Sequence, residues 1–172
     1  MIAAYKGTSF RSRLTRFVSW SDYSHISWVD VDGWEIEAWS SGVRKLDVAH
    51  SDHTPGTVVE IYDLDLTQVE LCVIRSFLHD QIGKDYDHMG NVHFLTRRPE
   101  YKSGQDKWFC SELIFAAFLR ICRPLLARIK AYKVYPGMIV YSPLLHYVET
   151  RTVQPPPADR IAVRRMEEIC VH

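Results

Sequence analysis

Hydrophobic and polar residues follow two different periods along this chain, and together they predict a mixed α+β domain. β-Branched and aromatic side chains, which favour strands, are concentrated in SHISWVDVDGWEIEAW (residues 24–39) and in TVVEIYD (residues 57–63). The first of these stretches predicts two strands joined by a turn. The apolar residues 2–5 predict a further short strand near the start of the chain.

A helical period begins just after this first strand. Ser9 is positioned to cap a helix over residues 10–20, whose basic side chains are all arginine. The apolar side chains recur on one side of this helix, as expected for a surface helix that buries a single stripe. The stripe that we expect to be buried consists of Phe10, Leu14, Phe17 and Val18.

Two longer helices are predicted later in the chain. A capping-box pattern opens a helix over residues 67–82, which Gly83 ends. A second helix begins at Cys110 and is apolar almost all round as far as Ile121, so we expect it to be buried centrally. Weaker patterns predict a strand over residues 135–141 and short helices over residues 125–131 and from residue 142 onward.

Length and charge exclude several classes of protein to which this chain could belong. The 172 residues include 21 basic and 21 acidic side chains, so the net charge is zero, whereas a duplex-binding protein normally has a basic excess. The longest apolar runs are far shorter than the roughly 18 residues needed to span a bilayer, and the first residues lack the apolar core of a secretory signal. We therefore expect no nucleic-acid partner, no membrane span and a cytoplasmic location. One domain is predicted over residues 1–150, followed by a Pro-rich C-terminal arm over residues 151–172.

Cys110 is the residue that most clearly suggests chemistry. At the first turn of a buried helix, unpaired backbone N–H groups and the helix dipole favour a thiolate and can hold an oxyanion. A nucleophile also needs a base, and His25 begins a predicted strand that would hold its ring rigidly. The two residues predict a Cys–His pair suited to nucleophilic catalysis. Cys72 and Cys122 lie in apolar helical patterns, where buried, reduced thiols are expected.

A third group should orient the imidazole, and the turn between the two strands decides whether Glu37 can do so. A three-residue loop over residues 31–33 places Glu37 diagonally beside His25 on one face of the hairpin. A two-residue turn at residues 32–33 shifts the register by one, and neither Glu35 nor Glu37 then shares that face. The sequence leaves both registers open.

A metal centre is a competing interpretation. Histidines and aspartates cluster around the start of a polar stretch over residues 84–107, which is long for a passive connection. The histidines concerned, His79, His88 and His93, have none of the spacings typical of zinc sites. The histidines of AHSDHTPG (residues 49–56) predict a solvated turn. We predict no metal site and no cofactor.

Four motifs in order carry a resemblance to a known family: YSHISWV, IEAW, GKDYD and WFCSELI. They resemble the circularly permuted NlpC-type cysteine hydrolases, papain-like proteins of the YiiX-like branch that are distantly similar to lecithin:retinol acyltransferase. In that family the histidine strand precedes the cysteine helix, as it does here. The resemblance covers roughly residues 5–148.

The resemblance implies a fold and a set of roles. The implied fold is α+β and papain-like, with a central antiparallel sheet packed against the buried helix that starts at the nucleophilic cysteine. Cys110 would be the nucleophile, His25 the base and then the acid, and Glu37 the orienting residue. Tyr86, in GKDYD, would line the cleft and contact substrate.

We therefore expect a cysteine hydrolase that cleaves amide bonds through a Cys110 thioester, with His25 as general base. Its partner would be a small peptide, amide or acyl substrate, and the family favours peptide or peptidoglycan-type amides. One alternative is a lipid acyltransferase or thioesterase that uses the same pair of residues. Another is a papain-like binding module whose thiol is inert, because a fold does not guarantee an activity.

Overall fold

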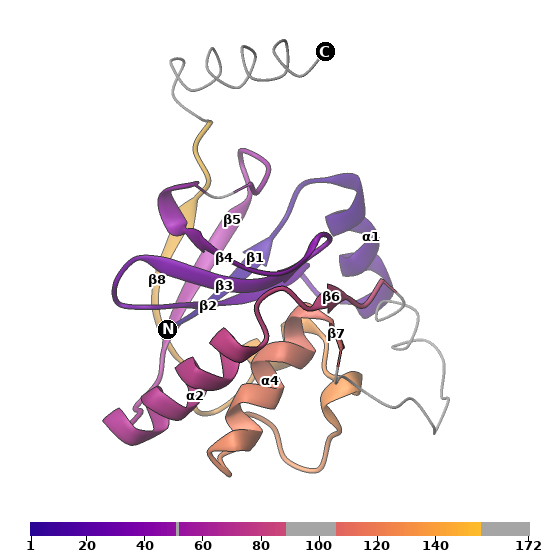
Figure 1. Ribbon diagram of the computed structural model, residues 1–172. Helices are drawn as coiled ribbons and strands as arrows, with labels where there is room; N and C mark the ends of the chain where they lie inside the picture. Colours follow the sequence, from indigo (N-terminus) through magenta and orange to yellow (C-terminus); the bar gives the residue numbers. More distant parts are fainter. Residues whose placement is uncertain (51, 89–105, 156–172) are drawn as a thin grey trace.

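The computed structural model describes residues 1–50, 52–88 and 106–155, which form a mixed α+β fold (Figure 1). Its centre is a six-stranded antiparallel sheet with the strand order β4-β3-β2-β1-β5-β8. The strands are β1 (Ile2–Lys6), β2 (His25–Val29), β3 (Trp34–Trp39), β4 (Gly42–Asp47), β5 (Val58–Asp63) and β8 (His146–Thr152).

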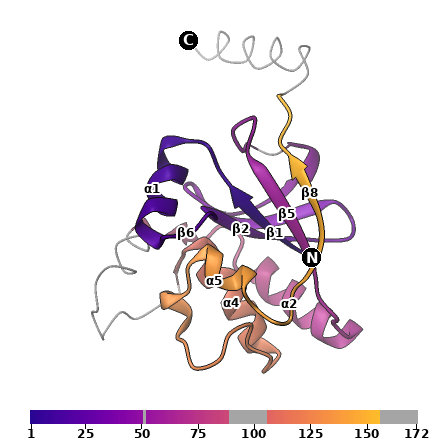
Figure 2. The ribbon, with the colours of Figure 1, turned by 180° about the vertical axis from the view of Figure 1, so that it is seen from behind.

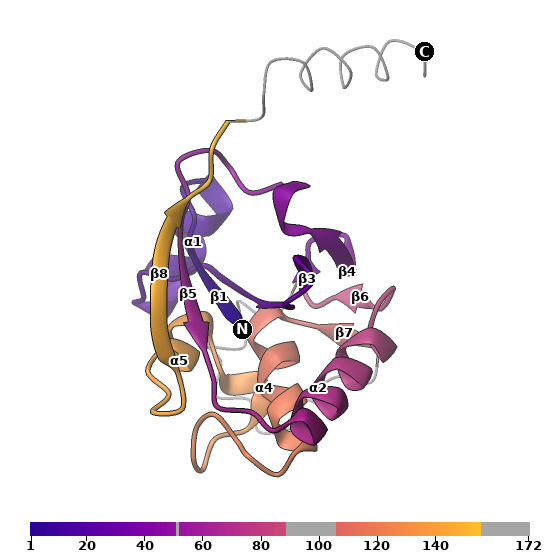
Figure 3. The same ribbon diagram turned by 90° about the vertical axis from the view of Figure 1, so that its left-hand side faces the viewer.

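Helices cover one face of the sheet. The α-helices are α1 (Phe10–Ser19), α2 (Gln68–Asp80), α4 (Cys110–Arg120) and α5 (Pro136–Val140), and short 3₁₀ turns occur at Val48–His50 and Ala131–Lys133. Figure 3 shows α2 and α4 side by side beneath the sheet, whereas α1 lies apart from them at its flank (Figures 1 and 2). A second, two-stranded parallel sheet joins β6 (Asp85–Tyr86) to β7 (Lys107–Trp108). Within the described residues, no helix combines the length and the apolar character needed to cross a membrane.

The β2–β3 hairpin has the three-residue loop. Trp28 pairs with Ile36 and Val29 with Glu35, and Gly33 has a φ of 78°, the left-handed conformation that this loop requires. Of the two registers that the sequence left open, the structure therefore has the one that places Glu37 diagonally beside His25 on one face of the hairpin.

Helix α4 is the central buried helix that its apolar pattern predicted. Leu113, Ile114, Phe115 and Phe118 are all fully buried, and they pack in one cluster with the inward side chains of β2 and β3. Truncating a buried phenylalanine such as Phe115 to alanine costs about 3–5 kcal/mol, so this contact holds the start of α4 firmly against the sheet.

Helix α1 has the predicted cap but the opposite orientation. The Ser9 hydroxyl accepts a hydrogen bond from the Ser12 amide, as expected of an N-cap. The buried side chains, however, are Thr15 and Ser19, while Phe10, Leu14 and Phe17 are exposed and Val18 is half-buried, so the expectation of a buried stripe is wrong. The polar face can be buried because the hydroxyls of Thr15 and Ser19 donate to carbonyls four residues earlier in the helix.

The C-terminal elements also differ from the prediction. Residues 125–128 form bends and turns rather than the start of a helix. Residues 136–140 form α5 rather than a strand, because proline is favoured at the first helical position. Ser142 does not start a helix: its hydroxyl donates to the Leu125 carbonyl and accepts from the Leu144 amide, which closes a turn. The chain then forms β8 at the edge of the sheet beside β5 (Figure 2), and this strand runs to Thr152. The arm beyond residue 155 lies outside the described residues.

Candidate active site

Cys110 is the first residue of α4, where the chain leaves a strand and enters the buried helix. The preceding residue, Phe109, has an extended backbone and provides no side-chain cap. The amides of the first turn have no partner within the helix, and Glu112 is the acidic residue there. The thiol therefore lies where backbone N–H groups favour negative charge, as the sequence indicated.

His25 lies between Cys110 and Glu37. Its Nε2 atom is 2.6 Å from Oε2 of Glu37, and the Cys110 side chain is both a hydrogen-bond partner and a charged neighbour of the same ring. All three residues are buried, with 1% of Cys110, 8% of His25 and 1% of Glu37 exposed. The structure therefore brings together the three residues that the sequence proposed as nucleophile, base and orienting group.

Charge keeps the His25 ring protonated. Burial alone would lower the pKa of His25, but the hydrogen bonds and charges of Cys110 and Glu37 outweigh it and raise that pKa to about 10. At neutral pH the ring is therefore a cation beside the Glu37 carboxylate.

Glu37 is held by two cationic groups, Arg44 and His25. Arg44 on β4 donates from Nε at 2.9 Å and from Nη2 at 2.7 Å to Oε1 of Glu37, which leaves Oε2 for His25. Burial would raise the pKa of Glu37, but the hydrogen bonds and positive charge of its partners, chiefly His25, hold that pKa far below its usual range. Arg44 is itself fixed by Asp52 at 2.8 Å and by the Trp39 ring at 4.6 Å.

His53 also belongs to this site, although the sequence indicated a solvated turn there. The residue is only 9% exposed, its ring stacks on Tyr5 at 3.9 Å, and its Nε2 atom is 3.7 Å from Oε2 of Glu37. Burial lowers the pKa of His53, and the nearby charges of His25 and Arg44 lower it further. No local pattern identified His53 or Arg44, because β4 was not predicted and the loop after it reaches the site only through tertiary structure.

Tyr86 lies near the start of α4. Strand β6 pairs with β7, which directly precedes Phe109 and Cys110, and the ring of Tyr86 packs against Phe109 at 5.8 Å. Burial raises the pKa of Tyr86 well above its usual value, and the charge of Cys110 raises it further. Tyr86 therefore lies near the first residue of α4, and its contact with substrate stays a prediction.

A second buried glutamate, Glu35, is close by but has different partners. Its Oε1 atom accepts the Tyr5 hydroxyl, and its Oε2 atom has no hydrogen-bond partner among the described residues. Burial and the charge of Glu37 raise the pKa of Glu35. In this structure Glu37, and not Glu35, is hydrogen-bonded to the imidazole.

One group of side chains within the described residues has the arrangement of a metal site. His25, Glu37 and His53 each offer one ligand atom, and these three atoms lie within 4.8 Å of one another. Neither His79 nor His88 belongs to this group, and His93 lies outside the described residues.

Two other thiols contradict the sequence-based expectation. Cys72 and Cys122 are exposed, although apolar helical patterns predicted that they would be buried. Cys72 is exposed on α2, and Cys122 follows the last turn of α4 with a φ of 54°.

Comparison with solved structures identifies a similar fold. The metalloprotein YiiX from Escherichia coli O157:H7, assigned to DUF1105, superposes with a TM-score of 0.59 over 90% of this chain and 96% of its own. The two chains share a fold. Their sequence identity is 15%, so YiiX supports the architecture and not the chemistry. No protein-family model matches this chain, and no curated protein matches it.

Proposed function

We propose that this protein is a cysteine hydrolase that uses Cys110 as nucleophile. The observation that carries the proposal is the buried chain of contacts from Cys110 through His25 to Glu37, with a 2.6 Å bond between the last two. A nucleophile, a base and a group that orients the base are the components that covalent acyl transfer requires.

The reaction would proceed in two steps. With His25 Nε2 engaged by Glu37, Nδ1 is the ring nitrogen left to face Cys110. The thiolate attacks the carbonyl carbon of an amide or ester, the His25 cation protonates the leaving group, and a thioester to Cys110 remains. Water then gives a proton to His25 and attacks the thioester, which releases a carboxylic acid and restores the thiolate. First-turn amides of α4 would stabilise the oxyanion in both steps.

The finer assignment rests on the resemblance of the four motifs. A circularly permuted papain-like fold of NlpC type accounts for the order of the histidine strand before the cysteine helix, and the likeness to YiiX is consistent with it. That family favours peptide or peptidoglycan-type amides as substrates. Tyr86, beside Cys110, is the residue that we propose to contact them.

Trapping of an acyl-enzyme tests the proposal without a known substrate. Incubation with activated acyl esters should add one acyl group to the chain, and peptide mass spectrometry should find it on Cys110. The Cys110→Ser and His25→Ala variants should not form it. Exposed Cys72 and Cys122 are internal controls: acylation of these thiols at an equal or higher rate would contradict an activated Cys110.

A metal-binding function is a second candidate, favoured by the His25, Glu37 and His53 group and by the description of YiiX as a metalloprotein. Two imidazoles and a carboxylate are a donor set that suits zinc. The fit is incomplete, because tetrahedral zinc needs its ligand atoms about 3.3 Å apart and the His25–Glu37 contact is 2.6 Å. Binding of metal would therefore break the hydrogen bond on which the hydrolase depends.

Zinc titration separates the two candidates. A hydrolase should keep its acylation rate in the presence of a chelator and lose it as zinc is added. The His53→Ala variant should bind zinc more weakly and resist this inhibition. Loss of acylation on chelation, restored by zinc, would favour the metal-dependent alternative.

A further inference from the structure

Helix α1 exposes the side chains that a surface helix normally buries. Phe10 is 82% exposed, Phe17 74% and Leu14 52%, and Trp20, directly after the helix, is 91% exposed. Isolated exposed apolar residues are common, but a contiguous aromatic patch marks an interaction surface. We name Phe10, Leu14, Phe17 and Trp20 the aromatic face of α1.

The arrangement of side chains around α1 is regular. At about 100° per residue, the side chains of Phe10, Leu14 and Phe17 point roughly opposite to those of Thr15 and Ser19, which face the protein. The aromatic face therefore points straight away from the molecule and not toward a groove in it.

Arginines line both borders of this face. The same geometry places Arg11 on one side of the aromatic face and Arg13 on the other, and both are exposed. Arg16 lies nearer the protein, 3.6 Å from Asp22, and α1 itself contains no acidic residue. Within the part of the chain that the structure describes, Arg11 and Arg13 belong to no ion pair.

We propose that α1 and Trp20 form a docking surface for an anionic lipid bilayer. A helix that lies in the plane of a membrane inserts its aromatic and leucine side chains below the headgroups, while basic side chains at its borders reach the lipid phosphates. Aromatic residues in the middle, arginines on both sides and small hydroxyl residues against the protein fit a flat, negatively charged apolar surface.

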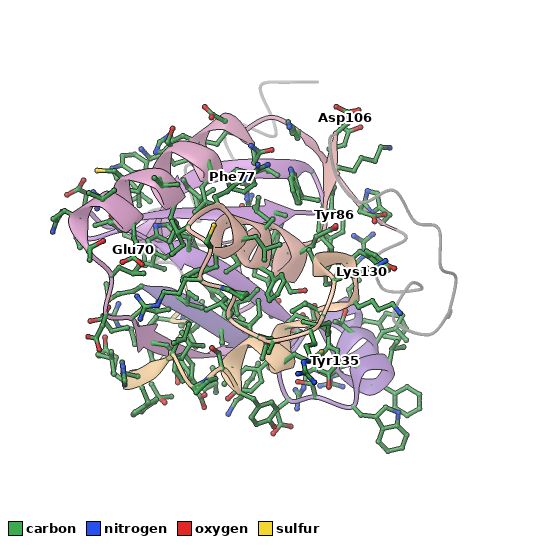
Figure 4. All side chains as sticks on the ribbon, turned by 90° about the horizontal axis from the view of Figure 1, so that it is seen from below. Glu70, Phe77, Tyr86, Asp106, Lys130 and Tyr135 are labelled. Carbon is green, nitrogen blue, oxygen red and sulfur yellow. The ribbon has the colours of Figure 1, made fainter. Side chains whose placement is uncertain are left out.

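The docking surface lies next to the candidate active site. Ser12 of α1 and Ser24 both lie so close to Gly7 that a side chain at Gly7 would clash with each of them, and Ser24 directly precedes His25. The charge of Arg11 also reaches Tyr86. In Figure 4, Tyr86, Lys130 and Tyr135 lie on the same side of the molecule as α1. A docked α1 would bring the proposed hydrolase site to the membrane, but the docking itself does not depend on that activity.

Vesicle co-sedimentation of the full chain tests the proposal. The protein should bind vesicles of phosphatidylcholine mixed with phosphatidylserine, bind phosphatidylcholine alone at least about tenfold more weakly, and lose binding as salt is raised. The double variant Phe10→Ser/Phe17→Ser should bind the mixed vesicles at least about tenfold more weakly. The double variant Arg11→Gln/Arg13→Gln should lose the preference for phosphatidylserine.

The controls separate docking from folding and from catalysis. Val69→Ser changes an equally exposed apolar residue on α2 and should bind like the unaltered chain, and circular dichroism should show that every variant is folded. Cys110→Ser should bind fully, so loss of the proposed chemistry would leave docking measurable. Equal sedimentation of the Phe10/Phe17 variant would overturn the proposal. The proposal would also be overturned if the chain did not bind vesicles but formed dimers through the aromatic face of α1.

Discussion

Glu35 and Glu37 differ by two positions on β3, face the same side of the sheet and are both buried, yet their carboxyl groups behave in opposite ways. The pKa of Glu37 lies far below its usual range, whereas the pKa of Glu35 is raised. Burial acts on both in the same direction, so the difference comes from their partners. Arg44 and His25 place positive charge beside Glu37, while the groups beside Glu35 that lower its pKa are mainly the neutral hydroxyls of Tyr5 and Ser27.

This difference assigns distinct roles to two identical side chains. A carboxylate that stays charged can hold a protonated imidazole in one orientation through the proposed reaction. A buried carboxyl with a raised pKa is held toward its neutral form and contributes to packing and hydrogen bonding. Substitution by glutamine, which keeps the shape and removes the charge, should therefore affect the two positions unequally.

Glu37→Gln should cause the largest change. Without the carboxylate, His25 loses part of the support that raises its pKa to about 10, so less of the ring stays protonated and its orientation is lost. We expect the rate of Cys110 acylation to fall by roughly 100-fold or more, and its alkaline limit to move to lower pH. A pH–rate profile measures both, with Glu35→Gln as the matched control. Equal losses of acylation rate in Glu37→Gln and Glu35→Gln would contradict the separate roles assigned to the two carboxyl groups.

Arg44→Gln should cause an intermediate change, because Arg44 touches Glu37 and not the imidazole. Loss of the guanidinium should raise the pKa of Glu37, so the acidic limit of the acylation rate moves to higher pH, with a smaller loss at the optimum. Arg44→Lys retains the charge but not the paired hydrogen bonds, and should restore part of the shift. An unchanged acidic limit in both variants would show that Glu37 needs only His25 to remain charged.

The sequence predicted those parts of the site that depend on local patterns. Short motifs predicted Cys110 at a helix start and His25 at a strand start. The two possible lengths of the hairpin loop left two registers for Glu37, and the structure has one of them. Arg44 and His53 could not be found in this way. They reach Glu37 only because β4 pairs with β3 and the following loop folds back over the site. Such tertiary contacts leave no periodic pattern in the local sequence.

The limits of local patterns also explain why the burial of α4 was predicted correctly and the orientation of α1 was not. The residues of α4 are apolar almost all round, so the helix can only be buried, and that prediction is confirmed. The pattern of α1 has two faces, and periodicity identifies the faces without saying which one meets the protein. Small hydroxyl residues that satisfy their own hydrogen bonds allowed the polar face to be buried. Strand β8 was missed because almost all its side chains are exposed and carry no alternation.

Glu35→Gln should cause the smallest change in acylation and should instead alter stability. The pKa of Glu35 is raised in the folded chain, so the folded state binds a proton more tightly than the unfolded state, and stability falls as pH rises above the ordinary value of 4.5. Removing the carboxyl should abolish this loss and leave Glu35→Gln relatively more stable as pH increases. Urea unfolding over a range of pH measures this difference in the free energy of unfolding.

Tyr5→Phe should have the opposite effect. The Tyr5 hydroxyl lowers the pKa of Glu35, so its loss should make the decline of stability with pH larger. A parallel pH dependence in all three proteins would mean that Glu35 stays charged in the core and that its partners, like those of Glu37, stabilise the anion.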